Sequence, residues 1–149
     1  MKRTLVLLSL LLVIFRAEAG NEIQIKFHEA KLPKNDHFGY QADGSHLHFF
    51  SNGKAEWTVS AKRAGAYTLE VKASCTKGPD GFAQFQISTN GKTAGKPVSL
   101  KRESVDEYTV KLELKRGQNI IGLAFVNDAY AEGEHDRNLF VHGLKLSAK

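Results

Sequence analysis

The chain has 149 residues, a formal net charge of +5 and a single cysteine. A length of this order is usual for one domain with its own hydrophobic core, and one cysteine excludes an intrachain disulfide. The basic residues are spread along the chain instead of gathering in a stripe, which argues against nucleic acid as a partner.

Residues 1–19 are typical of a secretory signal peptide. Lys2 and Arg3 precede an apolar run from Leu5 to Phe15, and an Ala-Glu-Ala stretch closes the segment. The apolar run is shorter than the roughly 18 residues that a membrane-spanning helix needs. We therefore predict a secreted or periplasmic protein without membrane insertion, whose mature domain is 20–149. Removing the signal peptide takes away three basic residues and one acidic residue, so the net charge falls from +5 to +3.

The mature chain shows the short alternating runs of β-strands, and helical periodicity is hard to find in it. Asn52-Gly53 predicts a hairpin between two of these runs, and Asn90-Gly91 predicts a turn after a later one. About nine short strands in a domain of this size indicate a single all-β domain, a β-sandwich of jelly-roll type. The clearest predicted strands are 22–27, 45–51, 54–61, 66–74, 81–89, 107–114, 120–126 and 138–147.

The alternation also predicts which side chains face the core. Residues 66–74 place four apolar side chains on one face, and residues 120–126 are apolar almost throughout, as in a central strand. Cys75 continues the first pattern as a small buried residue, with intermolecular pairing left open. The predicted core residues are Trp57, Tyr67, Leu69, Val71, Ala73, Leu139, Val141, Leu144 and Leu146.

An acidic segment separates the last two long runs. Asp128, Glu132, Glu134 and Asp136 fall within nine positions, where their mutual repulsion costs free energy unless a cation is present. Calcium takes about 6 to 8 oxygen ligands in flexible geometry, which an irregular loop can supply. From charge alone, a calcium loop and a solvated acidic loop without an ion are equally good interpretations.

Two motifs on either side of this segment carry a family resemblance. "AFVND" (124–128) and "DRNLFV" (136–141) resemble the closing motif of the calcium-dependent, xylan-binding carbohydrate-binding modules. "AGAYTLEVKAS" and "LKRGQNIIGLAF" look like turns of the broader class of β-sandwich carbohydrate-binding modules. The resemblance implies a loop-bound Ca²⁺ whose coordination shell is completed by the hydroxyls of a polysaccharide or oligosaccharide.

The resemblance also implies roles for individual residues of the segment. Asp128 and Asp136 would be the side-chain ligands of calcium, Glu132 or Glu134 an extra ligand, and His135 a source of a backbone carbonyl. Related modules often carry an aspartate where this chain has His142, and they use it for a second, structural calcium. Glu29 could supply the other half of that site, but an imidazole is a poor calcium ligand.

A sugar site also needs an aromatic platform, because the C–H faces of a pyranose pack on rings. Tyr40 and Tyr130 are the candidates. Arg137 and Asn138 have two interpretations, since the guanidinium could bind sugar oxygens or could neutralise Asp136 and pin the loop. We favour the pinning role.

His46 and His48 suggest a different metal site. They alternate on one strand and could be two of three ligands for zinc or copper. No third ligand is evident from the sequence.

Three functions compete. The first is a non-catalytic, calcium-dependent polysaccharide-binding protein, with a monomer favoured. The second is a structural or adhesion domain of the cell surface that calcium only stiffens. The third is a small glycosidase, which needs two carboxylates about 5 to 9.5 Å apart across a cleft. Four acids in one loop fit this third function poorly.

Overall fold

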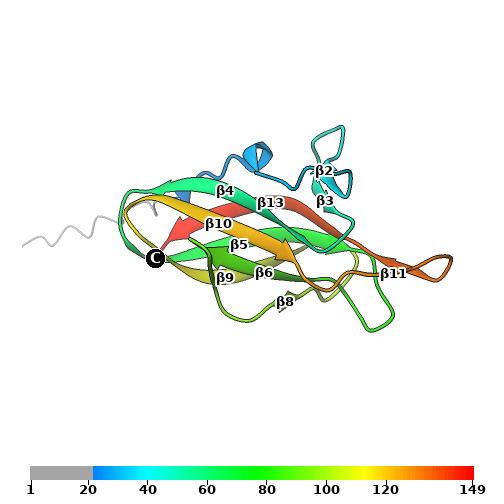
Figure 1. Ribbon diagram of the computed structural model, residues 1–149. Helices are drawn as coiled ribbons and strands as arrows, with labels where there is room; N and C mark the ends of the chain where they lie inside the picture. Colours follow the sequence, from blue (N-terminus) through cyan, green and yellow to red (C-terminus); the bar gives the residue numbers. More distant parts are fainter. Residues whose placement is uncertain (1–21) are drawn as a thin grey trace, which may run out of the picture.

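The computed structural model describes residues 22–149, so the predicted signal peptide lies outside the described residues. Two antiparallel sheets pack face to face in this part of the chain (Figure 1). It contains one short 3₁₀ turn, η1 (Phe27–Glu29), and no α-helix. No helix in residues 22–149 has the length and apolar character needed to cross a membrane. The predicted all-β sandwich is confirmed.

The larger sheet has six strands in the order β2-β3-β13-β5-β9, with β1 also paired to β13. The smaller sheet has five strands in the order β4-β10-β6-β7, with β8 also paired to β6. The bounds of the first set are β1 (Glu22–Ile23), β2 (Phe38–Tyr40), β3 (Leu47–Phe49), β5 (Gly65–Cys75), β9 (Asp106–Leu114) and β13 (Leu139–Ala148). Those of the second are β4 (Gly53–Ala61), β6 (Gln84–Thr89), β7 (Lys92–Thr93), β8 (Val98–Ser99) and β10 (Gly117–Phe125).

The core lies between the two sheets and follows the predicted alternation. The inward residues of β5 are buried, including Cys75, and burial raises the pKa of its thiol. Strand β10 lies between β4 and β6, which agrees with the central position predicted for residues 120–126. Leu144 is partly buried and packs against the core, opposite Val71, just after the register shift between Val141 and Gly143.

The predicted hairpin at Asn52-Gly53 was also wrong. Strand β3 pairs with β2 and β13 whereas β4 pairs with β10, so the chain crosses from one sheet to the other at this point. A β-carbon on Gly53 would lie 2.3 Å from the Phe38 ring, so the glycine serves close packing instead of a turn. The Asn90-Gly91 turn was predicted correctly: both residues have positive φ between β6 and β7.

The first predicted strand, 22–27, is shorter than expected. Only Glu22–Ile23 pairs with β13, and the chain then enters η1. The carbonyl oxygen of Phe27 accepts hydrogen bonds from the Trp57 indole at 2.9 Å and from the Tyr40 hydroxyl. These two bonds hold the segment against the sandwich in place of a longer strand.

Candidate functional site

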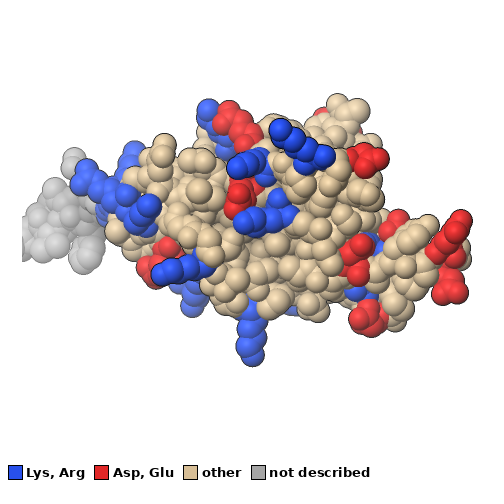
Figure 2. Space-filling view, in the orientation of Figure 1, with Lys and Arg blue, Asp and Glu red and all other residues tan. Residues whose placement is uncertain are grey.

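The acidic segment is a β-hairpin, not the irregular loop predicted from the sequence. Strand β11 (Ala129–Ala131) pairs with β12 (His135–Arg137). Gly133 adopts a φ of 74° at the tip, a conformation that favours glycine. The hairpin projects beyond the end of the sandwich that lies opposite the C-terminus (Figure 1). Acidic side chains mark its tip, whereas lysines and arginines lie mostly over the body and the opposite end (Figure 2).

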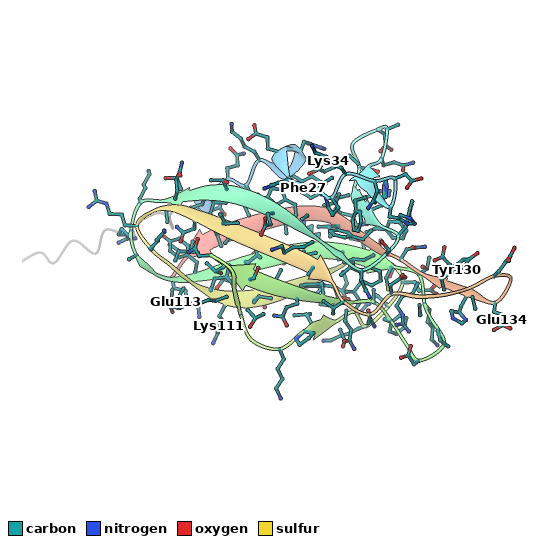
Figure 3. All side chains as sticks on the ribbon, in the orientation of Figure 1. Phe27, Lys34, Lys111, Glu113, Tyr130 and Glu134 are labelled. Atoms are coloured by element: carbon teal, nitrogen blue, oxygen red, sulfur yellow. The ribbon has the colours of Figure 1, made fainter. Side chains whose placement is uncertain are left out.

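The pairing of the hairpin decides which side chains share a face. Tyr130 lies opposite Asp136, so the two side chains point to the same side. Tyr130 is 67% exposed. Figure 3 shows Tyr130 along the hairpin and Glu134 at its tip. Glu132 also belongs to the exposed tip, whereas His135 pairs with Ala131 on the face opposite to Asp136.

Asp128 lies at the base of the hairpin with one buried carboxylate oxygen unused. Its backbone N–H donates to Asn52 Oδ1 at 2.8 Å, while its own Oδ1 is buried without a hydrogen-bond partner. Burial raises the pKa of the Asp128 carboxyl above its usual range, and the nearby Asp136 carboxylate raises it further against a hydrogen bond from Ala129. A buried acceptor without a partner is costly, so this oxygen is suited to a ligand.

Asn138 provides a second unused oxygen at the same place. The hairpin register extended past the Ala129–Arg137 pair sets Asn138 opposite Asp128. Asn138 is buried, and its Oδ1 has no hydrogen-bond partner. Thr76 holds its backbone, because Asn138 N–H donates to Thr76 Oγ1 at 2.8 Å and its carbonyl accepts from Thr76 N–H at 3.1 Å. The amide oxygen is thus fixed but not satisfied.

The atoms at the hairpin base that could bind a metal ion are oxygens, the ligand atoms that calcium prefers. They are the carboxylates of Asp128 and Asp136 and the amide of Asn138, so the residues present fit a calcium ion. Among residues 22–149 no three His, Cys, Asp or Glu side chains converge as a metal site. The acidic residues thus do not form the single four-carboxylate cluster that the sequence suggested.

Arg137 is a structural residue of the hairpin base. Its side chain is 2% exposed and donates hydrogen bonds to the carbonyl oxygens of Asn127 and Gly81 and to the Asp80 carboxylate. The ion pair is with Asp80, not with Asp136 as the sequence suggested, and it lowers the pKa of the Asp80 carboxyl. The buried guanidinium agrees with the pinning role and gives no support to a contact with sugar.

Gly78 makes room for the Arg137 guanidinium. A β-carbon at Gly78 would lie 2.4 Å from one guanidinium nitrogen and 2.7 Å from its central carbon. We therefore expect Gly78→Ala to displace Arg137 and to lower the free energy of unfolding by about 1–3 kcal/mol, the usual cost of overpacking. Urea unfolding would measure this, with Gly143→Ala as a comparison because open space surrounds that glycine and its φ is not positive. Equal costs at the two positions would contradict the close fit at Gly78.

Tyr40, the last residue of β2, packs against the η1 segment. Its hydroxyl donates to the Phe27 carbonyl, and its ring lies 5.5 Å from that of Phe27 and 5.0 Å from that of His28 between centroids. Burial raises the pKa of its phenol. Tyr130, by contrast, stands exposed on the same face of the hairpin as Asp136.

The sheet pairing brings His142 beside His46, which the sequence did not reveal. Their ring centroids are 5.3 Å apart, and His142 Nε2 lies 2.8 Å from Ser74 Oγ. His48 instead stacks on Phe50 at 4.3 Å, so the alternating histidines do not share a metal site among the described residues. Glu29 forms an ion pair with Lys26 at 3.1 Å.

Several residues of the site escaped the sequence analysis. Asn52 was interpreted as a turn residue, yet its side chain holds the backbone of Asp128. Asp80 and Thr76 belong to the segment between β5 and β6, which carried no signal of its own. Asn127 uses its amide to bind Gln84 N–H at 2.6 Å and the carbonyl of Phe82 at 3.0 Å. All four join segments that are distant in sequence.

Solved structures with the same fold are carbohydrate-binding modules. The CBM36-1 domain of a multidomain xylanase from the hindgut metagenome of Trinervitermes trinervoides aligns with a TM-score of 0.66 at 18% identity, covering 87% of this chain and 98% of that one. A CBM36 module in complex with calcium and xylotriose aligns with a TM-score of 0.61 at 13% identity, covering 85% and 97%. A family 35 module from Clostridium thermocellum gives 0.56 at 20% identity, covering 83% and 90%.

These likenesses define the fold as that of the β-sandwich carbohydrate-binding modules. A comparison with curated proteins found no match. The sequence profile of one family matches residues 68–149, more than half of the chain. The protein belongs to this family, CBM60, which is described as a calcium-dependent, xylan-binding carbohydrate-binding module. The predicted family resemblance is thereby confirmed.

Proposed function

We propose that this protein is a secreted, non-catalytic polysaccharide-binding protein that holds a xylan-like chain through a calcium ion at the base of the β11–β12 hairpin. The observation that carries the proposal is the pair of buried, unpartnered oxygens, Asp128 Oδ1 and Asn138 Oδ1, beside the Asp136 carboxylate. Family membership supports the choice of calcium as the ion and of a xylan-like chain as the sugar.

In this proposal each residue of the site has a separate task. Asp128, Asp136 and Asn138 supply oxygens to calcium, which when bound offers coordination positions to adjacent sugar hydroxyls. Asn52 and Thr76 fix the backbone on either side of the ion. Tyr130 provides an exposed ring for the C–H face of a sugar. The carbonyl of His135 remains a candidate ligand, and Glu132 and Glu134 are candidates only if the tip folds toward the base.

The test is titration calorimetry with xylan, galactan and mannan fragments, first in calcium and then in a chelator. We expect binding only in calcium. A Glu132→Gln/Glu134→Gln variant serves as a charge control and should lose less than about fivefold, as expected for exposed charges. Binding that survives the chelator, or calcium uptake without affinity for any glycan, would overturn the proposal. The second result would favour a domain that calcium only stiffens.

A further inference from the structure

A row of rings covers part of the outer face of the six-stranded sheet. On β13, Leu139 and Val141 point into the core. Phe140 and His142, which alternate with them along the strand, therefore point outward. Phe140 pairs with His48 of β3, and the period of two places His46 and Phe50 on the same outward face. We call these five side chains the ring strip: Phe50, His48, Phe140, His46 and His142.

The rings of the strip touch one another in series. His48 stacks on Phe50 with centroids 4.3 Å apart and planes 15° apart, and Phe50 lies 6.4 Å from Phe140. Phe140 meets His46 edge to face at 5.2 Å, and His46 lies 5.3 Å from His142. Phe50 is 43% exposed. The strip is therefore a continuous series of rings, of which Phe50 is exposed and the other four are half-buried.

The neighbouring edge strand leaves this surface uncovered. Gly39 of β2 pairs with His48, and a β-carbon at Gly39 would lie 3.1 Å from the His48 ring. A side chain at this position would press on the ring and shield it. Glycine keeps the strip accessible from the β2 side.

The strip begins where the proposed calcium site ends. Asn138 immediately precedes β13 and lies two positions before Phe140. On the other side Asn52, which holds the backbone of Asp128, follows Phe50 by two positions. The five residues from Asn138 to His142 make four steps along the chain, a span of about 13 Å. The strip therefore extends the contact surface well beyond the hairpin base.

The far end of the strip opens into a shallow groove. A groove of about 340 Å³ lies there between β5 and β13, beside the register shift after Val141. Its lining residues are Glu70, Lys72, His142, Gly143, Leu144 and Lys145. Carboxylate and ammonium groups are good partners for hydroxyls.

We propose that the ring strip is a second contact surface for the same polysaccharide, so that one extended, uncharged chain runs from the hairpin base to the groove at Gly143. This inference rests on the proposed function. Rings pack against the C–H faces of sugars, and imidazole nitrogens exchange hydrogen bonds with hydroxyls. None of the five strip residues carries a carboxylate, and burial lowers the pKa of His48 and of His142, which favours the neutral form of each ring. A neutral polysaccharide suits such a surface.

The experiment measures affinity against chain length, by calorimetry in saturating calcium with xylo-oligosaccharides from xylobiose to xylohexaose. For the unmodified protein we expect affinity to rise with length until the strip is covered. Phe50→Ala should weaken binding of the longest fragment about tenfold, the equivalent of one lost ring contact. It should leave the shortest bound fragment unaffected. His46→Ala is the second variant, since its ring lies farther from the calcium site.

The matched control is Ile120→Ala, because Ile120 is 45% exposed on β10 of the other sheet. It should change no affinity. Thermal unfolding of each variant separates loss of contact from loss of fold. Affinity that is independent of length, or unchanged in both strip variants, would overturn the strip and leave the calcium site standing. A complete absence of binding by the unmodified protein would instead overturn the proposed function, and the strip with it.

Discussion

Asp128→Asn should make the protein more stable in calcium-free buffer and should remove its calcium-dependent binding of sugar. The native carboxylate is desolvated and lies near Asp136, which together raise its pKa. A neutral amide of the same shape avoids both costs but is a weaker ligand. We expect calcium affinity to fall at least about 100-fold, more than the loss usual for residues that only support a ligand. Calorimetric titration with calcium, and thermal unfolding with and without it, would measure the two effects.

The pH dependence of the unmodified protein follows from the same raised pKa. Between the usual carboxyl pKa and the raised one, the folded calcium-free protein holds a proton on Asp128 that the unfolded chain has lost. The contribution of the Asp128 carboxyl to the stability of the calcium-free protein therefore falls as the pH rises through this window. Calcium requires the ionised carboxylate, so calcium affinity should weaken as pH falls through the raised pKa. In the Asp128→Asn protein, neither the calcium-free stability nor the calcium affinity should show this dependence on pH.

Asp136→Ala is the companion variant, because Asp136 is exposed and has no comparable burial. It should also abolish calcium-dependent binding, but it should leave calcium-free stability nearly unchanged. Calcium affinity that survives in the Asp128→Asn protein would contradict the assigned ligand. Unfolding of the Asp136→Ala protein in the absence of calcium would favour a purely structural role for this hairpin.

Much of the fold was predictable because β-sheet burial has a local signature. The period of two in residues 66–74 predicts the inward face of β5, and the positive φ required at Asn90-Gly91 predicts a real turn. Asn52-Gly53 has the same local pattern, yet it lies at a crossing between sheets. Turn propensity describes a few residues, whereas sheet membership depends on partners elsewhere in the chain. The sequence alone could not distinguish the two cases.

The candidate site was predictable only in part, for a related reason. Asp128 and Asp136 stand close together in sequence beside a recognisable motif, so both could be named in advance. The partners that shape the site come from distant segments: Asn52 lies 76 positions from Asp128, and Asp80 lies 57 from Arg137. The ring strip likewise arises from pairing between β3 and β13, which places His142 beside His46. Contacts of this kind follow from topology, not from local pattern.

Arg137→Met should destabilise the whole protein by roughly 2–4 kcal/mol, because each buried carbonyl left without its donor costs about 1–3 kcal/mol. Methionine fills much of the volume but donates no hydrogen bond, so the carbonyls of Asn127 and Gly81 lose their donor. Urea unfolding would measure the loss. Asp80→Asn is the control, since Asp80 is 80% exposed and its exposed charge should contribute less than about 1 kcal/mol.

The same pair of variants distinguishes pinning from sugar recognition by Arg137. If the guanidinium only pins the hairpin base, Arg137→Met should weaken calcium binding together with sugar binding, because the backbone carbonyl it holds immediately precedes Asp128. Saturating calcium should then restore much of the affinity for sugar in the fraction that remains folded. Normal stability and calcium affinity with loss of sugar binding would show instead that Arg137 contacts the sugar. That result would require the buried guanidinium to move outward on binding, away from Gly78 and Asp80.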